Sequence, residues 1–200
     1  MRHGLLTAVF ILAAASAALA EPPARGESDW PCRQVKVAGL SVASIWNGPP
    51  IDGVARPTDP ATSDLVARLA ARRTSLEDAQ ELIDEFAKAA GDARKERLTG
   101  LFASLYDKLD HERSDVVAGL ERYGRAQKDF AQKLRDATEK LRQAQDARRD
   151  SEEIKELAKA FEWNMRMFEE RRKATTYVCE SPALIEQRLG ALARIIEAAI

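Results

Sequence analysis

Apolar residues recur with helical spacing along the chain from residue 60 to the C-terminus. Positions three or four apart share one face of a helix, so such spacing indicates amphipathic helices. Two short runs come first: Leu65, Val66, Leu69 and Ala70, then Leu76, Ala79, Leu82, Ile83 and Phe86. Gly91 follows the second run as a stop signal. The pattern predicts two short helices ahead of a longer helical region.

The third helical stretch is the longest and contains a repeat of seven. Its apolar positions are Leu98, Phe102, Leu105 and Leu109, followed by Val116, Tyr123, Phe130, Ala137 and Ala144 at intervals of seven. A seven-residue repeat lets a helix keep one stripe against a partner helix. Gly119 and Gly124 interrupt the pattern, and each costs about 1 kcal/mol relative to alanine in a helix. These glycines therefore indicate a close crossing or a bend.

The periodicity is interrupted around Asp150. No apolar residue lies between Ala147 and Ile154, and Asp150 with Glu153 three residues later is typical of a helix start. A new stripe then runs through Ile154, Leu157, Phe161, Met165 and Phe168. We therefore expect the chain to reverse here, which gives an antiparallel coiled-coil hairpin with arms of residues 120–149 and 151–178. The alternative is one unbroken helix, because the turn contains neither glycine nor proline. A separate last helix is expected to begin at Ser181-Pro182.

The N-terminal part differs, because seven of the eight prolines fall in residues 21–60. Proline removes a backbone donor and restricts the residue before it, so long helices are excluded there. We expect an extended strap whose Trp30 and Trp46 pack on the helices; a ligand platform is the weaker interpretation of these tryptophans. The predicted fold is thus all-α: a small helical bundle base within residues 61–200, carrying the long antiparallel hairpin, preceded by the Pro-rich strap.

Residues 1–20 have the pattern of a secretory signal peptide. Arg2 precedes an apolar run, and Ala18-Leu19-Ala20 is a cleavage site, so we expect the mature chain to begin at Glu21. The apolar run is too short for stable membrane insertion, and Glu21 stands where a lipoprotein needs cysteine. The alternative is an uncleaved membrane anchor. The expected location is periplasmic or extracellular.

The chain has two cysteines, Cys32 and Cys179, at opposite ends. An oxidising compartment favours one disulfide between them, which would pin the strap to the helices. The alternatives are an intermolecular bridge or two buried thiols. Neither a C-x-x-C redox pair nor a haem-attachment motif is present, so the sequence does not indicate disulfide-exchange or electron-transfer chemistry.

Charge and composition narrow the function classes. The chain has 31 Lys and Arg against 32 Asp and Glu, and removal of Arg2 with the signal leaves 30 against 32. Nucleic acid is therefore not an expected partner, because phosphate binding favours a net basic surface. Charged residues make up 32% of the chain and aromatic residues 6%. That balance suits long, surface-rich helices better than a compact enzyme.

Candidate chemistry is sparse. His111 is the one histidine outside the signal segment, and Asp107, His111 and Asp115 follow one another at intervals of four, so they share one helix face. They form a weak metal candidate, since a site needs further ligands from another helix. No phosphate-binding loop or dinucleotide motif appears, so we predict no cofactor and no catalytic residue.

A soft apolar cluster stands out in the second arm: Phe161, Trp163, Met165, Met167 and Phe168. Packing in the hairpin seam is its plain interpretation; a contact surface for a partner and a weak copper site are the functional ones. The leading hypothesis is a secreted, non-enzymatic helical interaction or scaffold protein that contacts another exported protein or itself. The alternatives are a periplasmic holdase-type chaperone and a metal-binding protein that uses His111.

Overall fold

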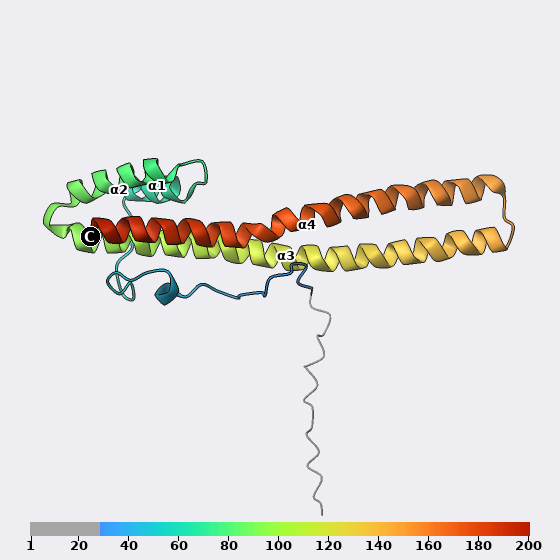
Figure 1. Ribbon diagram of the computed structural model, residues 1–200, viewed down its shortest axis with the longest axis horizontal. Helices are drawn as coiled ribbons and strands as arrows, with labels where there is room; N and C mark the ends of the chain where they lie inside the picture. The colour runs from blue at the N-terminus through green and yellow to red at the C-terminus, as the bar shows by residue number, and fades with distance from the viewer. Residues whose placement is uncertain (1–28) are drawn as a thin grey trace, which may run out of the picture.

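The structure, a computed structural model, describes residues 29–200. Within them the chain forms helices α1 (Pro60–Ala70), α2 (Leu76–Ala90), α3 (Arg94–Asp146) and α4 (Ser151–Ala199), with 3-10 turns at Val42–Ser44 and Gly91–Ala93. α3 and α4 run antiparallel as one long hairpin, and α1 and α2 cover one side of its base (Figure 1). The predicted all-α fold with a helical base and a hairpin is confirmed. The predicted signal peptide lies outside the described residues.

An apolar core holds the base together. All four helices contribute to it, and its fully buried members include Leu69, Ile83, Leu98, Leu101, Phe102, Leu105, Leu109, Leu189, Leu192 and Ile196. Burial of each such side chain stabilises the fold by about 1.5–3 kcal/mol. The core ends near residue 109 on α3 and residue 185 on α4. The core is therefore confined to the base, and the outer arms, residues 120–146 and 151–178, extend beyond it.

Side-chain caps fix the two short helices. Asp59 accepts a hydrogen bond from the backbone N–H of Thr62 at 2.9 Å at the start of α1. Ser75 and Asp78 form a capping box at the start of α2. Arg188 of α4 donates from Nε to the carbonyl of Leu69 at 3.0 Å, which satisfies an acceptor in the last turn of α1. These hydrogen bonds therefore pair backbone groups at the ends of α1 and α2 that have no partner within their own helix.

The hairpin turn is built without glycine. The backbone N–H of Arg149 bonds to the carbonyl of Ala144, and that of Arg148 to the carbonyl of Gln145, each at 3.0 Å. This is the Schellman arrangement, which needs a residue with positive φ; Arg148 supplies it at φ 51°. Asp150 then caps α4 by accepting from the backbone N–H of Glu152 at 2.8 Å. The cap predicted at Asp150 is present, and the unbroken-helix alternative is wrong.

The expected separate helix at Ser181-Pro182 is wrong, because α4 runs without interruption from Ser151 to Ala199 with Pro182 inside it. Proline removes the N–H that would bond to the carbonyl four residues earlier, that of Val178. The next carbonyl, that of Cys179, accepts a hydrogen bond from the side chain of Gln34. Pro182 is buried, so packing in the base offsets the lost hydrogen bond. No helix of the described part is long and apolar enough to cross a membrane.

Candidate functional site

The strap, residues 29–59 in the structure, runs along the hairpin on the side away from α1 and α2 (Figure 1). The part of the strap nearer α1, which we call its inner end, is held by Trp46. This side chain is buried and stacks on the Phe102 ring, with 3.9 Å between the ring centroids and 8° between the ring planes. Arg56 adds an ion pair with Asp107 at 2.8 Å. Trp46 thus serves core packing, as expected from the sequence.

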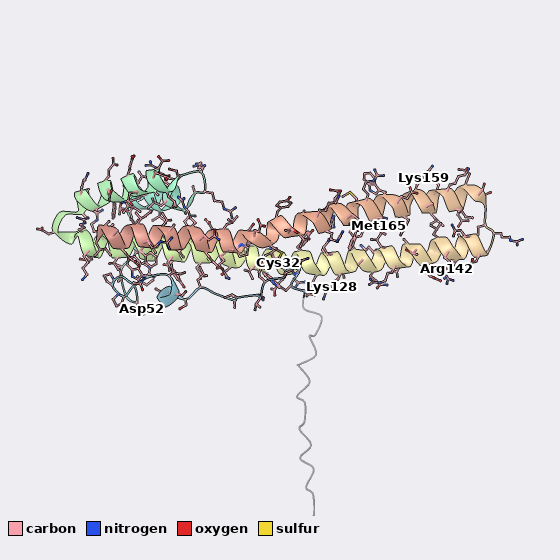
Figure 2. The ribbon with its side chains drawn as sticks, viewed as in Figure 1. Cys32, Asp52, Lys128, Arg142, Lys159 and Met165 are labelled. Carbon is pink, nitrogen blue, oxygen red and sulfur yellow. A yellow bond between two sulfur atoms is a disulfide. The ribbon has the colours of Figure 1, made fainter. Side chains whose placement is uncertain are left out.

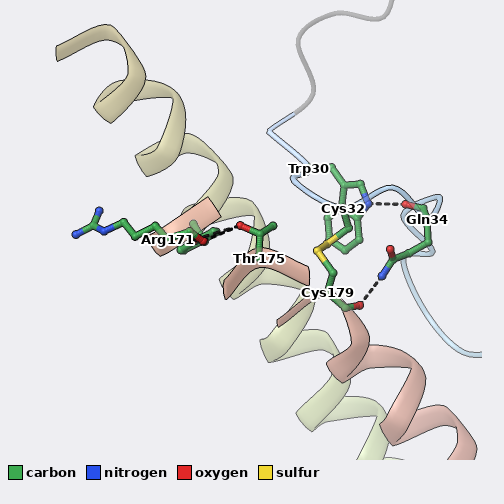
Figure 3. Close-up of a disulfide and its surroundings, with 7 residues drawn as sticks. Trp30, Cys32, Gln34, Arg171, Thr175 and Cys179 are labelled. Atoms are coloured by element: carbon green, nitrogen blue, oxygen red, sulfur yellow. Dashed lines mark hydrogen bonds between the residues drawn. A yellow bond between two sulfur atoms is a disulfide. The ribbon is translucent and has the colours of Figure 1, made fainter. Parts of the chain in front are cut away.

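The other end of the strap is held by a disulfide. Cys32 is bonded to Cys179 of α4, with 5.6 Å between their α carbons. The indole nitrogen of Trp30 donates to the carbonyl of Gln34 at 2.7 Å, and the Gln34 amide in turn donates to the carbonyl of Cys179 (Figure 3). The predicted pairing of the two cysteines is present, and local hydrogen bonds support it.

Beyond the disulfide, the strap crosses α3 in close contact at Gly124. A β carbon at Gly124 would lie 1.7 Å from the carbonyl oxygen of Asp29, so only glycine fits. Asp29 also pairs with Lys128 at 3.2 Å and with Arg125 at 3.3 Å. Burial acts to raise the pKa of Asp29, but the hydrogen bonds from Lys128 and Arg125 outweigh it and lower the pKa. The close crossing predicted from the glycines is therefore present at Gly124, whereas a β carbon at Gly119 would meet only the guanidinium of Arg122, at 3.7 Å.

Between its two ends the strap is held both by hydrogen bonds to its backbone and by side-chain packing. Arg113, which is buried, donates to the carbonyl of Val37 at 3.0 Å and pairs with Glu186 at 2.6 Å. Tyr106 donates its hydroxyl to the carbonyl of Leu40 at 2.6 Å. Val37 itself is 53% exposed. Leu40, Val42 and Ile45 pack against the core, while Val37 is held through its backbone carbonyl.

A groove of about 600 Å³ lies beside the disulfide, between the strap and the two long helices. Its lining includes Gln127 of α3, Arg33 of the strap, and Phe168, Arg172 and Glu180 of α4. The side-chain oxygen of Gln127 is buried and has no hydrogen-bond partner among the described residues. This groove could not be predicted from the sequence, because its lining comes from three segments far apart in the chain.

Only some residues of the predicted contact cluster lie in the seam between α3 and α4. Phe161 and Phe168 are half-buried in the seam, and Phe168 meets Phe130 edge-on with 6.0 Å between ring centroids. Met167 is also half-buried. Trp163 is 61% exposed and Met165 is 37% exposed; Met165 lies on the outer arm between the disulfide and the tip (Figure 2). Seam packing accounts for the two phenylalanines, while Trp163 faces away from α3.

Other large apolar side chains lie on the same side of α4 as Trp163. Tyr177 is 74% exposed and Leu184 is 44% exposed. Trp163, Glu170, Tyr177 and Leu184 follow one another at intervals of seven, which is nearly two helical turns, so they share one stripe. We call this stripe the outward face of α4. Neither Tyr177 nor Leu184 was predicted as a contact residue, although their seven-residue spacing from Trp163 is a signal that identifies them.

The weak metal candidate receives no support from the geometry. Asp107 pairs with Arg56, while His111 contacts Asp115 at 3.6 Å and both side chains are more than 70% exposed (78% and 73%). No other helix adds a ligand, and residues 29–200 contain no group of three or more His, Cys, Asp or Glu able to hold a metal ion.

A search among protein families, characterised proteins and solved structures finds no match to this chain.

Proposed function

We propose that this chain is an exported, non-enzymatic helical interaction protein. In this proposal the outward face of α4 binds another exported protein or a second copy of the chain. The observation that carries the proposal is Trp163, a tryptophan 61% exposed on a regular helix. Tryptophan is the residue type most enriched among the energetic centres of protein interfaces.

The fold does not need the outward face. Trp163 lies five residues from Phe168, or about 140° around the helix, and Phe168 is the residue that meets Phe130 of α3. The seam therefore holds the arms together without Trp163 or Tyr177. Trp163 and Tyr177 are both exposed on one side of the helix, and in this proposal a partner covers them.

Charge and position also support a contact surface. Glu170, which lies between Trp163 and Tyr177 on the stripe, pairs with Lys173 at 2.9 Å. Charged residues of both signs thus border the exposed aromatic rings, as at the polar rim of many interfaces. The core of the fold lies in the base, so a partner can bind the outer arm without disturbing that core.

Export is supported by the disulfide and by the N-terminal pattern. A single structural disulfide that closes a long loop is stable in an oxidising compartment and rare in the cytosol. The signal-peptide pattern of residues 1–20 is consistent with the same location.

The test compares the mature chain, residues 21–200, with a Trp163→Ala/Tyr177→Ala double variant. Light scattering after size exclusion reports self-association, and affinity capture from a periplasmic extract followed by reconstitution with the purified partner reports heteromeric binding. We expect one of these complexes to form with the natural chain and to weaken at least tenfold in the double variant. Each substitution removes a large aromatic side chain that the partner buries in the complex. Lys155→Ala, near the tip and 61% exposed, is the control. A natural chain that stays monomeric and captures nothing, or complexes indifferent to the double variant, would refute the proposal.

A holdase-type chaperone is a second candidate, because the exposed apolar residues are spread along an arm and not gathered in one patch. Such a spread suits weak contacts with many unfolded clients. Aggregation of a denatured client, followed by light scattering, distinguishes the two functions: a holdase suppresses it at stoichiometric amounts, whereas a specific interaction protein leaves it unchanged.

A further inference from the structure

The groove beside the disulfide contains a polar group that the fold itself does not use. Gln127 of α3 is one of its lining residues. Its amide oxygen is buried and unpaired within the described part of the chain. A buried polar atom without a partner destabilises a fold, so such an atom needs an explanation such as a bound water, ion or ligand. Because Gln127 lines the groove, this oxygen is a candidate acceptor for a group bound there.

Two opposite charges stand at the same groove without pairing. Arg33 directly follows Cys32, and Glu180 directly follows Cys179, so the disulfide keeps the two residues in one neighbourhood. Both line the groove, yet neither takes part in an ion pair within residues 29–200. A cation and an anion that are held near one another and remain unpaired are available to a ligand with charges of both signs.

The remaining lining completes a site for a small amphiphilic molecule. Phe168 offers an apolar wall, and Arg172 adds a second guanidinium that pairs with Glu169 at 2.9 Å at the rim. The volume of about 600 Å³ falls in the range of ligand pockets, about 300–1,000 Å³. Apolar walls with a few polar groups of defined position are the usual composition of such pockets.

We propose that this groove binds a free amino acid or short peptide by its two charged ends. The carboxylate of the ligand accepts hydrogen bonds from Arg33 and Arg172, and its ammonium group donates to Glu180 and to the Gln127 amide oxygen. An apolar ligand side chain packs on Phe168. This site is separate from the outward face of α4, so the proposal does not depend on the interaction function.

The probe is the dipeptide alanyl-leucine, added to the disulfide-bonded mature chain and followed by calorimetry and by amide chemical shifts. We expect saturable binding with shifts confined to residues 31–34, 127 and 168–180. The N-acetylated and the C-amidated dipeptides each lose one charged end, so each should bind about tenfold more weakly, the loss expected for one charge-assisted hydrogen bond.

Three substitutions test the assigned contacts. Arg33→Ala and Glu180→Gln should each weaken binding by about tenfold. Gln127→Leu should weaken binding while the thermal midpoint stays the same or rises, because it removes an unpaired buried atom; a purely structural role would lower the midpoint. Arg142→Ala at the tip is the control and should bind as the natural chain does. Absence of saturable shifts at millimolar dipeptide, shifts outside the groove, or equal affinity in all three variants would overturn the proposal.

Discussion

The carbonyl of Asp29 lies directly against the α carbon of Gly124, so that a β carbon at Gly124 would meet its oxygen at 1.7 Å. The contact joins an irregular segment to the middle of the longest helix, 95 residues away along the chain. It also explains why a helix otherwise rich in good helix formers contains glycine at this point.

Gly124→Ala should detach the start of the strap from α3. Alanine in place of a helical glycine would by itself stabilise a helix by about 1 kcal/mol, but the overlap with Asp29 forces the strap away. We expect a net loss of about 1–3 kcal/mol in the free energy of unfolding, as for other overpacked contacts. Denaturant unfolding measures it. Gly119→Ala is the matched control in the same helix, since its nearest neighbour is the flexible end of Arg122 at 3.7 Å; it should stabilise. A gain in both variants would contradict the close contact.

Removal of the disulfide should destabilise the whole protein and loosen one part of the strap. The bond closes a loop with a sequence separation of 147, for which loop entropy predicts about 5 kcal/mol of stabilisation. In a Cys32→Ser/Cys179→Ser variant, hydrogen exchange should rise in residues 29–39. Residues 42–57 should stay protected by the stack of Trp46 on Phe102. Uniform loss of protection along the strap would show that the inner end depends on the bond as well.

Arg148→Gly at the hairpin turn should stabilise the protein. Arg148 has a φ of 51°, a conformation that costs a residue with a β carbon roughly 1 kcal/mol and costs glycine nothing. We therefore expect a gain of about 1 kcal/mol in the free energy of unfolding. Arg148→Ala is the control, because alanine keeps the β carbon and should give no gain. Equal effects of glycine and alanine would mean that the arginine side chain, and not the backbone, decides stability there.

The two α-helical hairpin arms and the cap at Asp150 could be predicted from the sequence, because apolar periodicity and capping residues act locally. The continuity of α4 could not. Ser181-Pro182 is a good helix start in isolation, and only burial of Pro182 in the base makes it a position inside a helix. The turn at Arg148 likewise lacks the glycine that usually marks it.

The candidate sites were predicted less well, for a physical reason. Exposure of Trp163 depends on which side of α4 meets α3, and the sequence offered two overlapping stripes, one with Phe161 and Phe168 and one with Trp163 and Tyr177. Only the first stripe is in the seam. The groove beside the disulfide depends on where the strap lies, and an extended segment has no periodicity from which its path can be predicted.

Trp163→Ala should separate binding from stability. Because the side chain is 61% exposed, the free energy of unfolding should change by no more than about 0.5 kcal/mol, while binding of the partner or second copy should weaken. Phe168→Ala is the contrast, because its ring meets Phe130 in the seam and its loss should destabilise the arms. Thermal unfolding of both variants, measured beside their binding, checks the assignment. A large loss of stability in Trp163→Ala would place that indole in the fold and not at an interface.

The attachment of Asp29 to Lys128 and Arg125 of α3 should weaken at low pH. Its pKa is lowered in the folded chain by Lys128 and Arg125 against the effect of burial. The folded state therefore gains stability from this carboxylate above its ordinary pKa of about 4, and the gain is lost as the pH falls through the lowered value. Amide shifts of residues 29–32 should stay constant from neutral pH to about 4 and move below it. Asp29→Asn should remove this transition, and persistence of it in the variant would assign it to another group.

Pro182 lies one helical turn from Cys179 within an otherwise regular α4. Prolines inside helices are the usual sites of bending, so the outer arm can tilt relative to the base at this point. The arm from residue 178 to residue 151 is about 42 Å long, and a tilt of about 10° at its root would carry the tip about 7 Å. The disulfide and the Gln34 hydrogen bond hold the strap across that root. The strap therefore limits how far the outer arm can tilt relative to the base.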